Sequence, residues 1–416
     1  MKIKDIAVNV YSCIHDPEVL LFWCGYRVEG KRDIPLVKIT TDEGFVGYGE
    51  AYQGNDVSNV LPSFQKVASG LLGEDPLDIP GIWLKVAKII PDEAQRNIAM
   101  APFDTALHDI DGKVSGKSVS ELLGTRRRDR VKVYASAGLI YRSIDRYVKE
   151  ALAVVEMGFK GYKLKLGQGP AEDVKIVKAV RDAIGEEMAL MVDGHYWFMK
   201  LGGGWYMYSP KSIRWMAREF EKLDIHWLEE PFPHAEIGMY KDFKEACPNI
   251  RIATGESAKT LSEYKALLES GAVDVVQGEP IQQGGLTMCK QITDLSTSMG
   301  KQFVPHAWST RFAVASTLQL LATLTDEQNP WQEYTFYTTE KGKGLYTFPL
   351  ADEILAEPMR IEDGYMSIPN KPGLGVEISE AALKKHPRTV GPSHYIVSVL
   401  PFSHIPESPF GLTEIP

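Results

Sequence analysis

Cysteines are few in this sequence, and long apolar runs and basic clusters are absent. The four cysteines (Cys13, Cys24, Cys247 and Cys289) have no CxxC spacing, so we expect free thiols in a reducing compartment and no zinc site. No stretch approaches the ~18 apolar residues of a membrane-spanning helix. The N-terminus also lacks the apolar core of a signal peptide. We therefore expect a cytoplasmic protein that does not bind membranes.

The net charge of the sequence excludes some classes of binding partner. The formal net charge is −9 at pH 7, and no run of basic residues occurs. Such a balance argues against binding to nucleic acid or to anionic membrane surfaces. If the substrate is an anion, the site must supply local cations or a metal ion to hold it.

The 416 residues divide into three regions of different pattern. Residues 1–130 hold strand patterns followed by helical ones, which predicts an α+β domain. Residues 131–350 alternate short apolar runs with amphipathic stretches. Residues 351–416 are rich in glycine and proline, and we expect this segment to return to the first domain and to end in a proline-rich tail. We interpret the polar residues of the helix expected over 97–113 as ordinary helix polarity; they are Asp104, His108, Asp109 and Asp111.

Eight apolar runs recur in the middle region at the spacing of strand, loop, helix and return loop. They lie at residues 131–136, 161–166, 188–193, 225–230, 250–256, 273–279, 301–306 and 331–334. Eight such units predict an α/β fold, a closed (β/α)8 (TIM) barrel, with an N-terminal α+β capping domain completed by the C-terminal segment. The alternative is an open doubly wound sheet. The barrel is favoured because no glycine-rich phosphate turn follows the first run.

Ionisable residues stand at the ends of successive runs. They are Lys163, Lys165, Asp193, Glu229, Glu256, Glu279, His306 and Glu333. Active sites of such barrels lie at the carboxyl ends of the strands. We therefore expect these side chains to converge on one mouth.

Three of these residues are carboxylates that end consecutive strands: Asp193, Glu229 and Glu256. They would repel one another unless a cation lies between them. Oxygen ligands suit a hard ion, which predicts Mg²⁺, with Mn²⁺ as an alternative. The other interpretation is that these are structural acids in salt bridges. Glu230 follows Glu229 and should point to the opposite face of the strand.

Lys163 and Lys165 are two residues apart on one predicted strand, so both side chains should point into the barrel, about 6–7 Å apart. Two close ammonium groups near a divalent cation lower each other's pKa. A lysine with a lowered pKa can act as a base near neutrality. The alternative is an edge strand with a solvated lysine face.

His306 and Glu279 end neighbouring strands, so we expect them to lie within hydrogen-bonding reach. A carboxylate on one imidazole nitrogen fixes the tautomer and raises the basicity of the other nitrogen. The alternative is a core histidine. His195 lies two residues beyond Asp193 and is either a second acid or a loop histidine.

These residues together resemble the mandelate racemase branch of the enolase superfamily. The matching pieces are Lys163-x-Lys165, Val192-Asp193, Trp227-Leu228-Glu229-Glu230-Pro231, Gly255-Glu256, Gly284-Gly285-Leu286-Thr287, His306, Glu333 and the helix at 102–113. The resemblance covers roughly residues 1–375. This superfamily uses a Lys or His base, with Mg²⁺ stabilising an ene-diolate.

The resemblance implies a role for each site residue. Asp193, Glu229 and Glu256 would hold the Mg²⁺ that binds a substrate carboxylate, with Lys163 and Glu333 near that carboxylate. Lys165 and His306 would lie on opposite faces of the substrate as base and acid. Loops around 16–30 and 51–57 would select the substrate, a small molecule. Family habit also predicts a homo-oligomer, from dimer to octamer.

Two departures from the family pattern bear on the reaction. Glu279 stands where an aspartate usually partners the histidine, and His195 accompanies the Lys-x-Lys pair. Some acid-sugar dehydratases place an acid histidine at this position, and a departing β-hydroxyl needs a proton donor. We therefore predict a sugar-acid dehydratase yielding a 2-keto-3-deoxy acid. A racemase or epimerase using Lys165 and His306 is the alternative, and a non-catalytic binding protein is a third.

Overall fold

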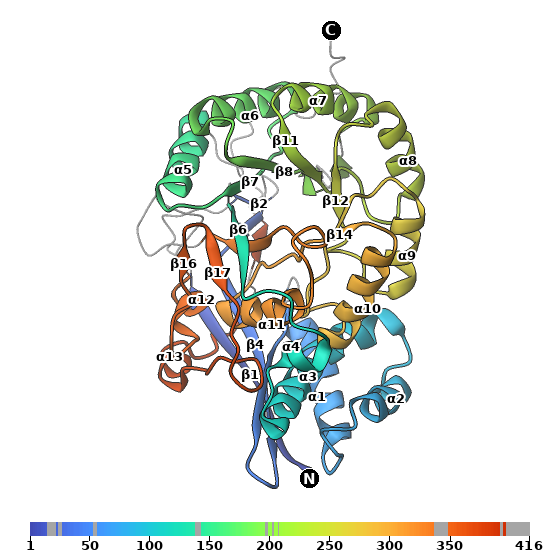
Figure 1. Ribbon diagram of the computed structural model, residues 1–416, viewed down its shortest axis with the longest axis vertical. Helices are drawn as coiled ribbons and strands as arrows, with labels where there is room; N and C mark the ends of the chain where they lie inside the picture. The colour runs from blue at the N-terminus through green and yellow to red at the C-terminus, as the bar shows by residue number, and fades with distance from the viewer. Residues whose placement is uncertain are drawn as a thin grey trace.

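The structure is a computed structural model. It describes residues 1–14, 22–23, 27–52, 56–137, 143–195, 199–201, 204–206, 208–336, 348–391 and 394–396. A large barrel lies above a smaller N-terminal domain, and the C-terminal segment runs beside both (Figure 1). The loops expected to select the substrate, and the tail beyond residue 396, fall largely outside the described residues.

The N-terminal domain is a three-stranded antiparallel sheet covered by helices. The sheet order is β1 (Ile3–Ile14), β4 (Lys31–Thr41), β5 (Val46–Glu50). The helices are α1 (Val57–Leu71), α2 (Ile79–Ile89), α3 (Glu93–Ser115) and α4 (Val119–Leu123). Strands followed by helices match the sequence pattern.

Helix α3 lies directly on strand β5, and glycines in the strand allow this contact. A Cβ atom on Gly49 would lie 1.8 Å from the carbonyl oxygen of Pro102, so no larger residue fits without moving the helix. The helix begins after Asp92, whose side chain accepts a hydrogen bond from Gln95 N. It ends at Gly116, which has the left-handed φ of 68° common at helix ends.

The eight predicted barrel strands are all present. They are β6 (Arg130–Ser136), β7 (Gly161–Lys165), β8 (Ala189–Asp193), β11 (Ile225–Glu229), β12 (Ile252–Thr254), β13 (Val275–Val276), β14 (Gln302–Phe303) and β15 (Gln332–Thr335). Neighbours from β6 to β14 pair in parallel and in chain order, and β15 returns to pair with β6. This cyclic order confirms the barrel over the doubly wound alternative.

Helices follow the barrel strands and form the outer layer in Figure 1. They are α5 (Ile144–Glu156), α6 (Pro170–Ile184), α7 (Pro210–Lys222), α8 (Ile237–Ala246), α9 (Leu261–Glu269), α10 (Gly285–Ser298) and α11 (Arg311–Leu321). Tyr162, Leu164 and Leu166 belong to the large core between strands and helices. A separate cluster fills the barrel interior below the mouth: Tyr134, Met191, Trp227, Ala253, Val275, Val304 and Trp331. The alternation along β7 therefore turns both lysines inward, as expected.

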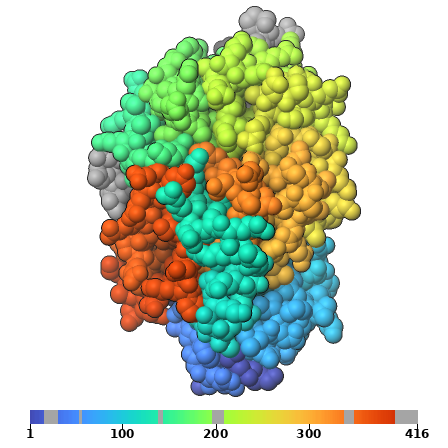
Figure 2. All heavy atoms as spheres, in the orientation of Figure 1, coloured from blue at the N-terminus to red at the C-terminus, as the bar shows by residue number. Residues whose placement is uncertain are grey.

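The C-terminal segment contacts both the barrel and the first domain. It contains α12 (Pro349–Glu353), β16 (Ile361–Glu362), β17 (Tyr365–Ser367) and α13 (Glu380–Lys385). Strand β17 pairs antiparallel with β6, while Pro387 bridges to Tyr11 of β1. Figure 2 shows this segment, in orange-red, against the teal chain near residue 125 and above the blue N-terminal domain. The three domain bounds given above stay a prediction.

Two small sheets complete the elements. Strands β2 (Phe22–Trp23), β3 (Arg27–Glu29) and β18 (His394–Ile396) form one of them, in the order β18-β3-β2. Strands β9 (Met199–Leu201) and β10 (Gly204–Tyr206) form the other, shortly after β8. In the described part of the chain, no helix is long and apolar enough to cross a membrane.

Candidate active site

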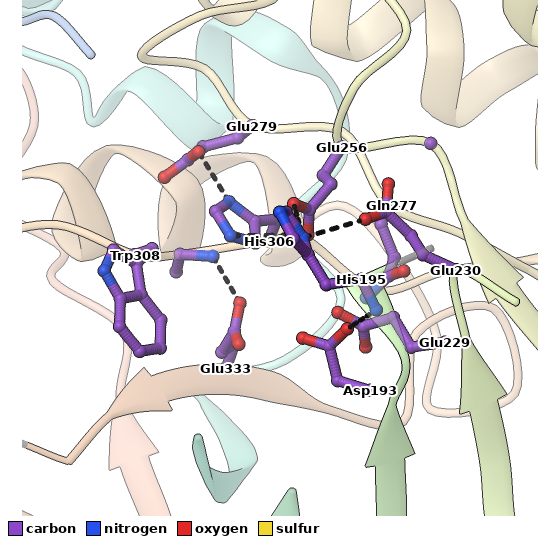
Figure 3. A network of polar contacts seen from close by, with 12 residues as sticks. Asp193, His195, Glu229, Glu230, Glu256, Gln277, Glu279, His306, Trp308 and Glu333 are labelled. Atoms are coloured by element: carbon purple, nitrogen blue, oxygen red, sulfur yellow. Dashed lines mark hydrogen bonds and ion pairs between the residues drawn. The ribbon is translucent and has the colours of Figure 1, made fainter. Parts of the chain in front are cut away.

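The strand-end residues come together at one mouth, where all are buried. Figure 3 shows Asp193, Glu229, Glu256, Glu279, His306 and Glu333 turned toward a common centre. Lys163 and Lys165 reach the same centre from β7 through their contacts with these carboxylates. Parallel strands in one barrel end at the same rim, so the sequence order alone dictates this convergence.

The two lysines pair with different carboxylates. Lys163 Nζ donates a hydrogen bond to Glu229 and lies 2.9 Å from Glu333 Oε1 and 3.8 Å from Asp193 Oδ2. Lys165 Nζ donates to Asp193 Oδ2 at 2.6 Å. The ammonium groups therefore neutralise part of the negative charge at the rim.

These contacts raise the pKa values of both lysines. Burial lowers the pKa of Lys165, but the charge and hydrogen bond of Asp193 together with the charge of Glu256 outweigh burial, and the net shift of this pKa is upward. Glu229 and Glu333 likewise raise the pKa of Lys163 against burial. The predicted lowering depends on a divalent cation beside the two ammonium groups and stays a prediction, whereas the protein's own carboxylates raise both pKa values. A divalent cation among the carboxylates would offset part of this effect.

The carboxylates do not share one electrostatic environment. Burial raises the pKa of Glu229 to about 8, against the opposing effect of Lys163. Burial and the nearby Glu230 raise the pKa of Glu256. Burial would also raise the pKa of Asp193, but Lys165 and Lys163 outweigh it and lower the value. Two of the three predicted ligands are thus destabilised as anions and would gain from a cation.

His306 and Glu279 form the close pair that the strand order predicts. Nδ1 of His306 lies 2.8 Å from Glu279 Oε2, and Nε2 lies 3.5 Å from Glu256 Oε2. Burial alone would lower the pKa of His306, but Glu256 and Glu279 raise it to about 10. Because Nδ1 donates to Glu279, Nε2 is the nitrogen that faces the mouth.

His195 also lies at the mouth. Its Nδ1 is 3.3 Å from Glu230 Oε2 and 3.7 Å from Glu256 Oε1, and its backbone N–H donates to Asp193 Oδ1 at 2.8 Å. Burial and Lys165 lower the pKa of His195 to about 4. The neighbouring side chains therefore shift the pKa values of the two mouth histidines in opposite directions.

Glu230 does not point to the opposite face, so that expectation is wrong. Strand β11 ends at Glu229, and Glu230 has a φ of 42°, which breaks the strand alternation. His195 has a similar φ of 40°. Left-handed backbone at non-glycine residues costs about 1–3 kcal/mol each and clusters at functional sites. Both strained residues bring their side chains to the mouth.

The donors at the mouth suit a hard divalent cation. Ligand atoms of Asp193, His195 and Glu230 lie within 4.8 Å of one another, a group that could hold a metal ion. Glu256 Oε2 is buried and accepts no hydrogen bond within the described part of the chain, where its charged neighbour is His306 Nε2 at 3.5 Å. A buried carboxylate oxygen in this condition is costly unless a cation compensates it. The grouping differs from the predicted trio, with Asp193 common to both.

Several mouth residues were missed by sequence reasoning. Trp308 lies two residues beyond His306, and its ring centroid is 5.1 Å from Lys165 Nζ. Glu50 ends β5 and accepts hydrogen bonds from Ser309 and Thr310, just beyond His306. Glu50 was recognisable as an acid at a strand end. The others lie in loops, where no periodicity fixes direction.

The polar residues of α3 also differ from expectation. Asp104 is fully buried and accepts hydrogen bonds from Trp83 Nε1 at 2.8 Å and from Thr287 N at 2.9 Å. His108 and Asp109 are buried as well. The reason is that α3 contacts α10 on one side and β5 on another, so little of it faces water. Asp104 thereby ties the N-terminal domain to the first turn of α10.

Comparison with known proteins identifies the family. Residues 25–124 match the N-terminal domain of the mandelate racemase / muconate lactonizing enzymes, and residues 146–382 match the enolase C-terminal domain-like family. The chain belongs to the mandelate racemase branch of the enolase superfamily. Members of this superfamily use a divalent metal.

Individual relatives match over nearly the whole chain. The chain is 32% identical to the D-galactarolactone cycloisomerase of Agrobacterium fabrum, over 91% of this chain and 98% of that protein. It is 30% identical to the arabinonate dehydratase of Saccharolobus solfataricus, over 92% and 99% respectively. The crystal structure of the 3,6-anhydro-D-galactonate cycloisomerase from Zobellia galactanivorans superposes with a TM-score of 0.80 at 30% identity, over 94% of this chain and all of that one.

Proposed function

We propose that the protein is a Mg²⁺-dependent acid-sugar dehydratase that eliminates water from an aldonic or aldaric acid. One observation carries the proposal. Lys165 Nζ borders Asp193 at 2.6 Å, and His306 Nε2 borders Glu256 at 3.5 Å. If the carboxylate trio holds a cation, a substrate carboxylate attracted to that cation would have its α-carbon near two nitrogen groups, each able to exchange a proton.

Asp193, Glu229 and Glu256 would hold the metal ion, with Mn²⁺ as an alternative to Mg²⁺. The ion supplies positive charge that offsets the charge developing on the substrate carboxylate. Lys163 lies against the same carboxylates and adds a fixed ammonium group beside that charge. Glu333 orients Lys163 and accepts a hydrogen bond from the Ala307 N–H at 2.6 Å.

The protein's own residues account for each proton. Lys165 or His306, once it has lost its own proton, would remove the α-proton, and the configuration at that carbon decides which of the two acts. A cation held by the neighbouring carboxylates would lower both pKa values and favour that deprotonated form. Glu279 accepts from Nδ1 and keeps Nε2 of His306 as the reacting nitrogen. Protonated His306, or His195 if it has taken up a proton in the complex, would then give a proton to the β-hydroxyl, which leaves as water. The resulting enol tautomerises to a 2-keto-3-deoxy acid.

A second outcome of the same site is supported by the relatives' names. Two of the three similar proteins described above are cycloisomerases. A cycloisomerase returns a product isomeric with its substrate, so the leaving oxygen would be a ring oxygen that stays in the molecule. Racemisation or epimerisation by Lys165 and His306 is the other alternative. The binding-protein alternative predicts no turnover.

Product analysis separates these outcomes. The protein with Mg²⁺ is incubated with pools of aldonic acids, aldaric acids and their lactones or anhydro forms, and products are followed by proton NMR and mass spectrometry. A keto acid lighter than its substrate by one water supports dehydration. A keto acid of unchanged mass supports ring opening, and a stereoisomer without a keto group supports epimerisation. No product with any pool would contradict the proposal, and Glu256→Gln serves as the control for a contaminating activity.

A further inference from the structure

A chain of hydrogen bonds extends the His306–Glu279 pair away from the mouth. Glu279 Oε2 lies 2.8 Å from His306 Nδ1 and accepts a second hydrogen bond, at 3.1 Å, from Gln282 Nε2. On its other side, Gln282 Oε1 accepts from Lys259 Nζ at 2.8 Å. Lys259 Nζ also donates to the backbone oxygen of Glu256 at 3.1 Å. The chain thus runs from the imidazole to the loop that follows β12.

The order of donors and acceptors along this chain is fixed by chemistry. A lysine ammonium group only donates hydrogen bonds, so the amide oxygen of Gln282 must face Lys259. The amide nitrogen of Gln282 then has to face Glu279. The reversed amide would set its oxygen against a carboxylate oxygen and its NH₂ group against an ammonium group. Lys259 therefore holds Gln282 in the one orientation that donates to Glu279.

Glu279 needs such a second anchor because of its length. A glutamate has one more rotatable bond than an aspartate, so a single hydrogen bond to His306 leaves more side-chain conformations accessible. Gln282 restricts them by binding the same oxygen that binds His306. The side chains of both Glu279 and Gln282 are almost fully buried, at 1% and 5% exposure, so water does not replace this contact at low cost.

We propose that Gln282, oriented by Lys259, is a positioning residue that sets Glu279 against His306. This inference rests on the proposed function, in which His306 exchanges protons with the substrate. Gln282 acts through Glu279 and His306, whereas, among the described residues, the side chain of its neighbour Gln283 binds backbone atoms. Gln283 Oε1 accepts from Glu279 N at 2.8 Å, and its Nε2 donates to Glu256 O at 2.7 Å. The two glutamines therefore have different roles. Gln283 holds the backbone at Glu279 and Glu256 together, and Gln282 holds the carboxylate of Glu279.

Two substitutions of Gln282 test whether the hydrogen bond that it donates to Glu279 matters separately from its packing. Gln282→Glu keeps the shape and the contact with Lys259 but replaces the donor facing Glu279 by an acceptor. Gln282→Leu removes both contacts. We expect kcat to fall on the order of 10- to 100-fold in each, by analogy with the loss of hydrogen-bond partners that orient metal-ligating residues. KM should stay unchanged because Gln282 does not touch substrate. Gln291→Leu, at an exposed position of α10, is the matched control and should retain full activity.

A double-mutant cycle distinguishes positioning from a general structural effect. In a Glu279→Gln background the dyad is already broken, so Gln282→Leu should lower kcat by less than about 2-fold further. Effects that multiply instead would overturn the proposal. So would a kcat unchanged in both Gln282 variants.

A spectroscopic readout keeps the inference independent of the reaction. In protein labelled with ¹⁵N-histidine, the Nδ1–H resonance of His306 is identified by its loss in His306→Gln. It should move in Gln282→Leu and Gln282→Glu and stay in place in Gln291→Leu. If no sugar acid reacts but the resonance moves, the proposed function fails and the positioning role stands. An unmoved resonance contradicts the positioning role, whatever the activity.

Discussion

The buried carboxyl group of Glu50 should make the free energy of unfolding depend on pH. This carboxyl group is buried at the end of β5 and accepts hydrogen bonds from Ser309, Thr310 Oγ1 and, at 3.4 Å, Thr310 N. Burial raises its pKa from an ordinary value of 4.5 to about 7, against the opposing hydrogen bonds from Ser309 and Thr310. The protonated form is thus favoured in the folded state.

The sign of the effect follows from this direction. Folded Glu50 holds its proton more tightly than unfolded Glu50, so the free energy of unfolding falls as the pH rises from about 4.5 to about 7. Each tenfold change in the protonation equilibrium is worth about 1.4 kcal/mol, which gives about 3 kcal/mol over this window. Glu50→Gln removes the titrating group. As the pH rises from about 4.5 to about 7, the free energy of unfolding of this variant should therefore gain about 3 kcal/mol relative to that of the wild type.

Denaturant unfolding of both proteins at steps from pH 4.5 to pH 8 measures this difference. Glu187→Gln, at an exposed position, is the matched control and should track the wild type. A difference between Glu50→Gln and the wild type that does not change with pH would mean that Glu50 does not titrate with a raised pKa in the folded protein. A change in the opposite direction would contradict the raised pKa as well.

Three further predictions concern the site and the fold. Glu256→Gln should abolish both turnover and Mg²⁺ binding, measured by calorimetry, while the far-ultraviolet spectrum stays native; unchanged turnover would refute its role as a ligand. Lys165→Ala and His306→Ala should each lower kcat by several orders of magnitude, about 10²–10⁴-fold from lost acid–base catalysis alone, and a mild effect at His306 would mean that its pair with Glu279 is not catalytic. Gly49→Ala should destabilise the protein by several kcal/mol, about 1–3 from overpacking and more if α3 cannot shift, because its Cβ would lie 1.8 Å from Pro102 O; an unchanged melting temperature would contradict the close contact.

Strand periodicity explains which parts of the site were predictable. Lys163 and Lys165 follow the two-residue alternation of β7, and Glu279 and His306 follow the order of neighbouring strands. Parallel strands of one barrel share a rim, so these placements require no knowledge of side-chain contacts.

The other site residues could not be placed from the sequence because their backbone does not continue the regular conformation of a strand. The side chain of Glu230 turns to the mouth because the φ angle of this residue is positive. A glutamate rarely adopts a positive φ, so the sequence does not predict this conformation. Gln282 lies in a loop whose direction depends on Gln283 and on the neighbouring strand. Asp104 seemed an ordinary polar residue because its burial arises only when the N-terminal domain and α10 enclose α3.

In the proposed function, Lys165 and His306 exchange the α-proton of a carboxylate substrate at this mouth. The most direct test is deuterium incorporation at the α-carbon from D₂O, followed by proton NMR with Mg²⁺ and a sugar acid that the protein turns over. Wild type should exchange the α-proton or release an eliminated product. One of the two variants, Lys165→Ala or His306→Ala, should lose α-proton removal entirely. The configuration at the α-carbon of the substrate determines which variant loses it. Full α-proton removal by both variants would contradict the claim.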